Sequence, residues 1–273
     1  MDIRLIAIDL DGTALKGNND ISPRTLHALR EADARGVWVV PVTGRQYKML
    51  PPFLPAPWTK YAVLCNGTEV RSLPDGALLA SHHMSPEMLL EHLPAFFKLG
   101  LPVELSGGGL LVSTPEMMAA IKGSPINPFH HVILEEHGLE VEDLATYLPS
   151  APYPFDKVNL PYVSPEKRDA LTELIPSLPF SGVWSGPNSM EVTHAEATKG
   201  KGLLTICRHL GIDPAHTMAL GDSGNDVPML AVAGLGVAMG NAPDFVKAAA
   251  RTVTLSNTED GAAIAIEKYV LNA

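Results

Sequence analysis

The chain has 273 residues, of which 46% are hydrophobic, and its formal net charge is −10. This length and apolar content allow one large α/β domain, or a core domain with a smaller second domain, and they exclude a disordered chain. The acidic balance argues against partners such as nucleic acid or an anionic membrane surface, because both favour a basic face.

The first part of the chain alternates strands with a helix. Residues 4–10 form a short and nearly continuous apolar run, which predicts a strand buried on both faces of a sheet. A helix is predicted over residues 21–36, with Ser22 as its N-cap, Pro23 at the first helical position and Gly36 after the last turn. Further strands are predicted at 37–45 and 60–67.

The sequence pattern changes over residues 82–183, where prolines are frequent and helical segments alternate with hairpin-like segments. We therefore predict an α+β domain over 82–183, inserted into a core domain formed by 1–81 and 184–273, with a hairpin over 69–81 leading into it. The insert contains five basic and thirteen acidic residues, so most of the negative charge belongs to it.

After the insert the strand–helix alternation resumes. It implies right-handed crossovers and hence an α/β fold with a doubly wound, Rossmann-like parallel sheet in the core. The predicted strands are 189–193, 216–222 and 235–239, and the predicted helices are 200–209, 224–234, 242–250 and 259–271.

Four polar signatures lie where the core elements join. They are Asp-Leu-Asp-Gly-Thr at 9–13, Thr-Gly-Arg at 43–45, Thr-Lys-Gly at 198–200 and Gly-Asp-Ser-Gly-Asn-Asp at 221–226. In open α/β sheets ligands bind beyond the carboxyl ends of the strands, so we expect these signatures to converge on one crevice.

Three aspartates in these signatures predict a metal site. Asp9, Asp11 and Asp222 would repel one another unless a cation lay between them, and carboxylate oxygens suit Mg²⁺. The same ion would attract a phosphate group. The positive charge of Lys199 and neutral hydrogen-bond donors would complete the phosphate site. The predicted phosphate-binding residues are Leu10, Thr43, Gly44, Lys199 and Asn225.

This set of residues predicts phosphate-ester hydrolysis. One aspartate would attack phosphorus to form an aspartyl-phosphate, and another would protonate the leaving oxygen and then activate water. The residues alone do not separate the two roles. The predicted partner is a small phosphorylated metabolite.

The motifs as a set resemble those of the haloacid dehalogenase superfamily, specifically the Cof-type phosphatases with a class IIB cap. The resemblance covers both core segments and is carried by DLDGT, VTGR, CNG, TKGKGL, LGDSGNDVPML and VAMGNAPDFVK with NTEDG. It implies that Asp9 is the nucleophile and that Asp11 is the general acid/base, which also binds the metal through its backbone carbonyl.

The resemblance also implies roles for the later motifs. Asp222 would bind Mg²⁺, Asn225 and Asp226 would support the loop and the phosphate, and Thr43 and Lys199 would hold the phosphoryl group. The insert would be a mobile cap over the leaving group, and the substrate would be a sugar phosphate. Apart from the resemblance, Arg45 is expected to lie at a helix start or to form a salt bridge rather than to bind phosphate.

Two alternatives remain open. A sugar phosphomutase would need arginines in the insert for a second phosphate, and Arg168 is the only one there. A non-catalytic phosphate-ligand binder could use the same fold, although it would not need Asp9. The acidic insert further predicts a preference for neutral or cationic leaving groups.

The cellular location is predicted from what the sequence lacks. Its two cysteines, Cys65 and Cys207, are far apart and indicate reduced thiols. The N-terminal residues do not resemble a signal peptide, and there is no run of about 18 apolar residues. We therefore expect a soluble, cytoplasmic protein.

Overall fold

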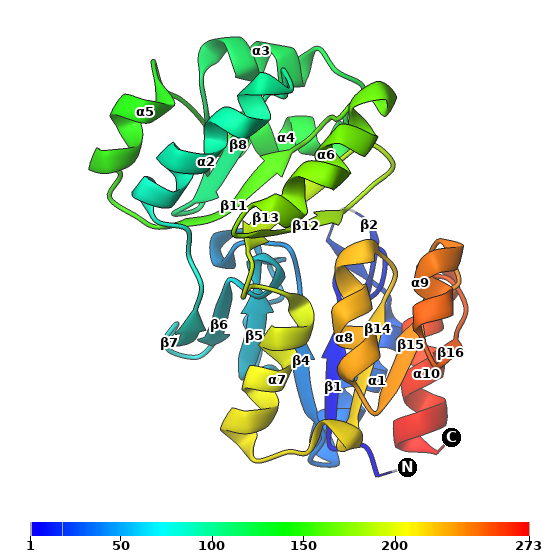
Figure 1. Ribbon diagram of the computed structural model, residues 1–273. Helices are drawn as coiled ribbons and strands as arrows, with labels where there is room; N and C mark the ends of the chain where they lie inside the picture. The colour runs from blue at the N-terminus through cyan, green and yellow to red at the C-terminus, as the bar shows by residue number, and fades with distance from the viewer. Residues whose placement is uncertain (1, 18, 273) are drawn as a thin grey trace. The chain divides into compact units, whose positions relative to one another are not determined.

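The computed structural model describes residues 2–17 and 19–272, except for the side chain of Phe129. The chain forms two compact units, which are coloured along the sequence in Figure 1. The first unit comprises Met1–Ser81 and Thr198–Ala273, and the second comprises His82–Ala197.

The parallel sheet predicted from the sequence forms the centre of the first unit, and it has five strands. Its strand order is β16-β15-β14-β1-β4. The central strand β1 is buried at every position, which explains why its sequence is continuously apolar rather than alternating. The bounds are β1 Leu5–Ile8, β4 Trp38–Pro41, β14 Thr217–Gly221, β15 Leu235–Ala238 and β16 Thr252–Val253.

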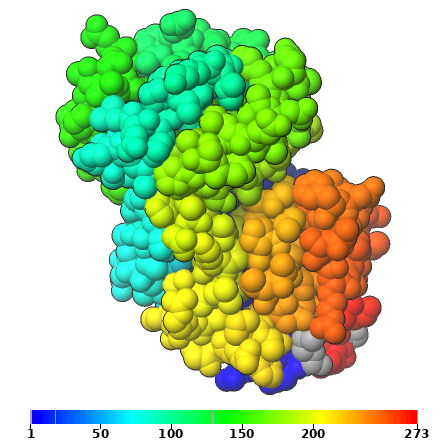
Figure 2. Space-filling view, in the orientation of Figure 1, coloured from blue at the N-terminus to red at the C-terminus, as the bar shows by residue number. Residues whose placement is uncertain are grey.

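Helices cover both faces of this sheet. Ile6 and Ile8 of β1 pack on the side of α1 and α10, whereas Leu5 and Ala7 pack on the side of α7 and α8. Figure 2 shows α7, in yellow, beside α8, in light orange, on one face of the unit. The fold is therefore doubly wound. The bounds are α1 Pro23–Ala34, α7 Lys199–Leu210, α8 Val227–Val232, α9 Asp244–Ala249 and α10 Gly261–Ile266.

The ends of these helices follow their sequence signals. Ser22 accepts a hydrogen bond from Thr25 N (3.0 Å) and caps α1, and Pro23 is its first residue. The helix predicted over 259–271 is in fact three successive pieces, a 3₁₀ turn at Asn257–Glu259, α10, and a π-helix at Glu267–Leu271.

Two smaller sheets complete the first unit. The strand predicted at 60–67 is β5, which begins an antiparallel three-stranded sheet of order β5-β6-β7. A bridge pairs its Val63 with Val42, the residue after β4. The predicted 69–81 hairpin is the β6–β7 pair. The bounds are β5 Tyr61–Leu64, β6 Glu69–Ser72 and β7 Leu78–Ser81, with a separate hairpin formed by β2 Leu15–Gly17 and β3 Asp20–Ile21.

The second unit contains a mixed six-stranded sheet of order β10-β9-β8-β11-β13-β12. Its apolar core includes Phe96 of α2, Leu105 of β8 and Val158 of β11. The strands are β8 Glu104–Gly107, β9 Leu110–Ser113, β10 Gly138–Glu140, β11 Phe155–Leu160, β12 Phe180–Trp184 and β13 Met190–His194. The helices are α2 Pro86–Lys98, α3 Pro115–Lys122, α4 Pro128–His137, α5 Leu144–Tyr147 and α6 Arg168–Leu174.

One predicted strand belongs to the other unit. Residues 189–193 were expected to resume the core sheet, but β13 pairs antiparallel with both β11 and β12 of the second unit. The second unit therefore ends at Ala197 rather than at the predicted 183, whereas its first boundary lies after Ser81. With this boundary the second unit has five basic and fifteen acidic residues, and the first unit has equal numbers of each.

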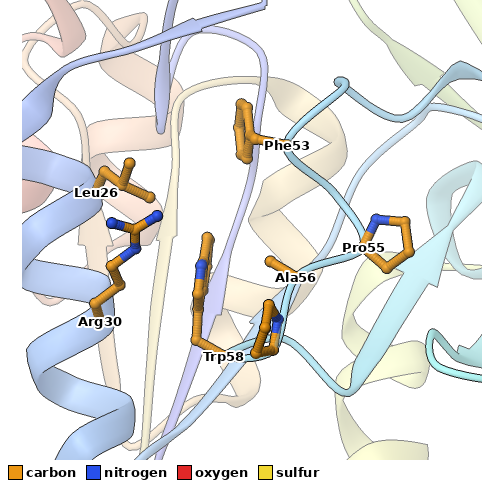
Figure 3. A pocket seen from close by; sticks show the side chains of 7 residues that line it. Leu26, Arg30, Phe53, Pro55, Ala56 and Trp58 are labelled. Atoms are coloured by element: carbon orange, nitrogen blue, oxygen red, sulfur yellow. The ribbon is translucent and has the colours of Figure 1, made fainter.

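A groove lies between α1 and the loop that follows β4. Figure 3 shows Leu26 and Arg30 of α1 facing Phe53 and Trp58 of that loop. None of the residues predicted to carry chemistry lines it. Within the described ranges, no helix combines the length and apolar character needed to cross a bilayer.

Candidate active site

The first unit brings Asp9 and Lys199 into direct contact. Asp9 follows the carboxyl end of β1, and Lys199 is the first residue of α7. Lys199 Nζ donates to Asp9 Oδ1 at 2.7 Å, and the lysine side chain is only 1% exposed. A lysine at a helix N-terminus opposes the helix dipole, so its position requires nearby negative charge.

Asp226 supplies the second negative partner. Its Oδ1 accepts from Lys199 Nζ (2.7 Å), and its Oδ2 accepts from the backbone N–H groups of Asp222 and Ser223 (2.9 Å each). Asp226 is fully buried. Both of its oxygens are thus occupied in holding the lysine and the loop after β14, which suits a supporting role better than metal binding.

Burial and neighbouring charges have opposing effects on the pKa values of Asp9 and Lys199. Burial raises the pKa of Asp9 well above its usual value, Lys199 opposes this, and the carboxylates of Asp226 and Asp222 add to it. Burial would lower the pKa of Lys199, but Asp226 and Asp9 outweigh burial, so the pKa is raised and the ammonium stays charged. One lysine therefore does not neutralise the surrounding carboxylates.

Asp222 lies next to this group and is held by neutral donors. Its Oδ1 accepts from Thr13 Oγ1 and its Oδ2 from Asn241 Nδ2, both at 3.2 Å. Burial, assisted by the charge of Asp226, raises the pKa of Asp222 to about 7. Neither Thr13 nor Asn241 had been assigned a role from the sequence.

The donor set fits a hard divalent cation. Carboxylate oxygens of Asp9, Asp222 and Asp226 lie within 4.8 Å of one another. Within residues 2–17 and 19–272, Asp9 Oδ2 has no hydrogen-bond partner, which leaves it free to bind a cation or to attack phosphorus. Burial, and then repulsion between the carboxylates, raises the pKa values of Asp9 and Asp222, and a cation would offset both effects.

The side chain of Asp11 is engaged elsewhere. Arg45 Nε and Nη2 donate to the two oxygens of Asp11 at 2.8 and 2.6 Å, and the aspartate side chain is 57% exposed. The sequence analysis grouped Asp11 with Asp9 and Asp222. In the structure, the acidic cluster consists of Asp9, Asp222 and Asp226, and the Asp11 carboxylate is not part of it. Arg45 thus forms a salt bridge, which is one of the two roles expected of it.

The neutral residues expected to bind phosphate are close to the strand ends. Thr43 is fully buried after β4, and its Oγ1 accepts from Arg45 N at 3.2 Å, so the turn containing Gly44 is closed tightly. The Leu10 carbonyl accepts from Leu15 N, whereas the Leu10 N–H makes no hydrogen bond to any residue that the structure describes. That N–H is a free donor in the first loop.

Asn225 is tied to a turn whose role had not been predicted. Its Nδ2 donates to Asn66 Oδ1 at 3.0 Å. Asn66 lies between Cys65 and Gly67, and all three residues have positive φ angles. A side chain at Gly67 would come within 2.3 Å of Thr198 O, so glycine allows the turn to approach the start of α7 and thereby position Lys199. The polar residues that follow β5 were the available signal for this turn.

The sequence matches the haloacid dehalogenase-like hydrolase family over residues 6–266. The chain therefore belongs to this family. A parallel sheet with an inserted mixed-sheet unit and an acidic cluster beyond the strand ends agrees with that membership.

The relatives identify the kind of enzyme. The chain is 31% identical to the 5-amino-6-(5-phospho-D-ribitylamino)uracil phosphatase YcsE of Bacillus subtilis, over 99% of this chain and 97% of the relative. It is 29% identical to the pyridoxal phosphate phosphatase YbhA of Escherichia coli, over 99% and 100%. A solved HAD subclass IIB sugar phosphatase superposes with a TM-score of 0.78 at 25% identity, covering 97% of this chain and 98% of that one.

The protein is thus a subclass IIB phosphatase of the Cof type, a phosphoric monoester hydrolase that acts on small phosphorylated metabolites. Membership of this family implies a divalent metal, with which the acidic cluster is consistent.

Proposed function

We propose that the protein is a Mg²⁺-dependent phosphatase that hydrolyses sugar or polyol monophosphates through a phosphorylated Asp9. The observation that carries this proposal is the environment of Asp9. One oxygen is fixed by the buried Lys199, and the other has no protein partner within the described ranges. A carboxylate held in this way is oriented for nucleophilic attack.

The metal would be held by the Asp9 and Asp222 carboxylates together with the Asp11 backbone carbonyl. When bound, it supplies positive charge to the phosphate oxygens and to the two carboxylates. Lys199 provides a second positive charge, and Thr43, Asn225 and the N–H groups of Leu10 and Gly44 provide neutral donors for the phosphoryl oxygens. Asp226 keeps Lys199 in place.

The reaction would take two steps. In the first, an oxygen of Asp9 attacks phosphorus, the bond between phosphorus and the leaving oxygen breaks, and Asp11 gives its proton to that oxygen. In the second, Asp11 takes a proton from water as the water attacks phosphorus, which releases inorganic phosphate and restores the Asp9 carboxylate. Asp11 must leave Arg45 to do this, because its carboxylate is bound to the guanidinium on both oxygens.

The preference for neutral sugar or polyol substrates rests on charge and on the relatives. The second unit has ten more acidic than basic residues, which disfavours substrates that carry additional anionic groups. One relative is named for a phosphoribityl substrate, and one structural neighbour is a sugar phosphatase.

The contacts of Arg168 argue against a phosphomutase function. This is the single arginine of the second unit. Its guanidinium lies 3.8 Å from the centre of the Trp184 ring and also binds the Pro187 carbonyl, so it is already engaged. A second phosphate would therefore lack an arginine partner in that unit.

The nucleophile is tested by Asp9→Asn, with Asp33→Asn on α1 as a matched control outside the site. We expect Asp9→Asn to lose at least about 10³-fold in p-nitrophenyl phosphate hydrolysis, and the control to keep full activity. Acid-quenched, unaltered enzyme should carry phosphate on the peptide that contains Asp9, detected by mass spectrometry. Undiminished turnover by Asp9→Asn would refute the assignment, and absence of turnover by the unaltered protein would favour a binding function.

The substrate class is tested by comparing kcat/KM for a hexose monophosphate and the corresponding bisphosphate. The monophosphate should be the better substrate at low ionic strength, and salt should narrow the difference because it screens the charge of the second unit. A higher kcat/KM for the bisphosphate would contradict the inference that the acidic second unit disfavours additional anionic groups. Conversion of one hexose phosphate to its isomer without phosphate release would instead identify a mutase.

A further inference from the structure

Asn241 connects three loops at the candidate metal site. It follows β15, and its Nδ2 donates both to the Gly12 carbonyl (2.9 Å) and to Asp222 Oδ2 (3.2 Å). Its Oδ1 accepts from the backbone N–H of Asn257 at 3.0 Å. A single exposed amide therefore joins the loop after β1, the loop after β14 and the turn before α10.

The orientation of this amide follows from its partners. The Asn257 N–H can only donate, so it requires the oxygen of Asn241, and the Gly12 carbonyl can only accept, so it requires the nitrogen. The Nδ2 group must consequently face Asp222. Asn257 is itself anchored, because its own Nδ2 donates to the Leu15 carbonyl at 2.8 Å.

The carboxylate of Asp222 has little freedom between its neighbours. A Cβ atom added at Gly12 would lie 2.4 Å from Asp222 Oδ2, which shows how closely the first loop approaches it. Thr13 binds one oxygen and Asn241 the other. Both donors are uncharged, so they orient the carboxylate without neutralising the negative charge that a cation needs.

We propose that Asn241 is a positioning residue for the divalent cation, which fixes the Asp222 carboxylate relative to the loop that carries Asp9 and Asp11. Its side chain binds Gly12, Asp222 and Asn257, so it acts through Asp222. The inference rests on the proposed function only insofar as that function places a cation on Asp222. Donors around a metal ligand commonly set both its orientation and the affinity for the metal.

The test measures Mn²⁺ binding to the metal-free full chain by electron paramagnetic resonance, which reads free Mn²⁺ and needs no turnover. We expect Asn241→Ala to raise the Kd for Mn²⁺ by about tenfold or more. Asn241→Ser, whose single hydroxyl cannot serve three partners, should lie between Asn241→Ala and the unaltered protein. Thermal unfolding in chelator shows that each variant is folded.

Asn257→Ala is the structural control. It removes the bond to the Leu15 carbonyl but keeps the backbone N–H that orients Asn241, so it should lower the Tm and leave the Kd for Mn²⁺ unchanged. Unchanged Mn²⁺ binding by Asn241→Ala, or equal weakening by Asn257→Ala, would overturn the inference. Failure of the unaltered protein to bind Mn²⁺ would instead refute the metal site of the proposed function.

Discussion

Lys199 Nζ lies 2.7 Å from Asp9 Oδ1, although 190 positions separate the two residues in the sequence. The lysine is 1% exposed and also binds Asp226 at 2.7 Å. A buried charge in such a group is tolerated only while its partners are present, since removal of one member leaves the others uncompensated. The contact thus couples the stability of the first unit to its chemistry.

Replacement of Lys199 by methionine tests this coupling. Lys199→Met keeps most of the side-chain volume but removes the ammonium partner of Asp9 and Asp226, so at pH 8 it should cost about 3–5 kcal/mol in the free energy of unfolding. Loss of its charge near the phosphate should also lower kcat by about 10²–10³-fold. Urea unfolding and steady-state kinetics measure the two effects.

Lys201→Met is the matched control for this prediction, because Lys201 is on the same helix and is exposed. It should change neither quantity appreciably. Equal losses in the two variants would mean that the helix needs positive charge in general and not the contact with Asp9.

A comparison of Gly12→Ala with Gly36→Ala distinguishes the effect of backbone strain from that of a steric clash at the site. Both have left-handed φ angles, +79° and +81°, so alanine at either should cost about 1–2 kcal/mol in stability. Only at Gly12 would the new Cβ meet the Asp222 carboxylate, because nothing lies within 4 Å of a Cβ at Gly36. Gly12→Ala should therefore lose divalent-cation binding and phosphatase activity.

Gly36→Ala, by contrast, should keep both of these properties. The measurements are thermal unfolding, a metal titration and phosphate release for each variant. Normal metal binding by Gly12→Ala would show that the loop relaxes away from Asp222 at no cost to the site.

The pKa of Asp222 predicts how the metal-free protein responds to pH. A folded-state pKa of about 7, against 3.8 for an ordinary aspartate, means that the folded protein holds this proton more tightly than the unfolded chain. The group therefore favours folding most at pH below 3.8, and this contribution is lost as pH rises through about 7. The proton also competes with the cation, so metal affinity should increase over the same interval.

Asp222→Asn isolates this contribution because it removes the titrating group. In chelator, the unaltered protein should lose stability relative to Asp222→Asn as pH rises from 5 to 8, as measured by urea unfolding. A constant difference across that range would contradict the raised pKa of Asp222.

Much of the first unit follows from local patterns in the sequence. The run before Asp9 is apolar throughout because β1 is buried on both faces, and Ser22 and Pro23 start α1 through interactions confined to one helical turn. Strand ends in a parallel sheet share one edge, which is why Asp9 and Asp222 could be grouped before their contacts were known. The doubly wound sheet is confirmed in this way.

What could not be predicted depends on partners that are distant in sequence. The pattern of β13 indicates a strand but not which sheet it joins, and its antiparallel pairing with β11 and β12 assigns it to the second unit. A salt bridge was expected of Arg45, but its partner Asp11 could not be predicted because it depends on how two loops meet. Asn241 lay inside a motif quoted for its resemblance, yet only the contacts with Gly12 and Asp222 give it a role.

The order of the strands affects how the nascent chain can fold. β1 lies between β4, made soon after it, and β14, which is synthesised only after the whole second unit. As the polypeptide leaves the ribosome, the edge of β1 that pairs with β14 therefore stays unpaired until the intervening residues have emerged. During that interval the N-terminal aspartate that we propose as the nucleophile has neither its lysine nor the loop of Asp222, so chemical competence can arise only late in translation.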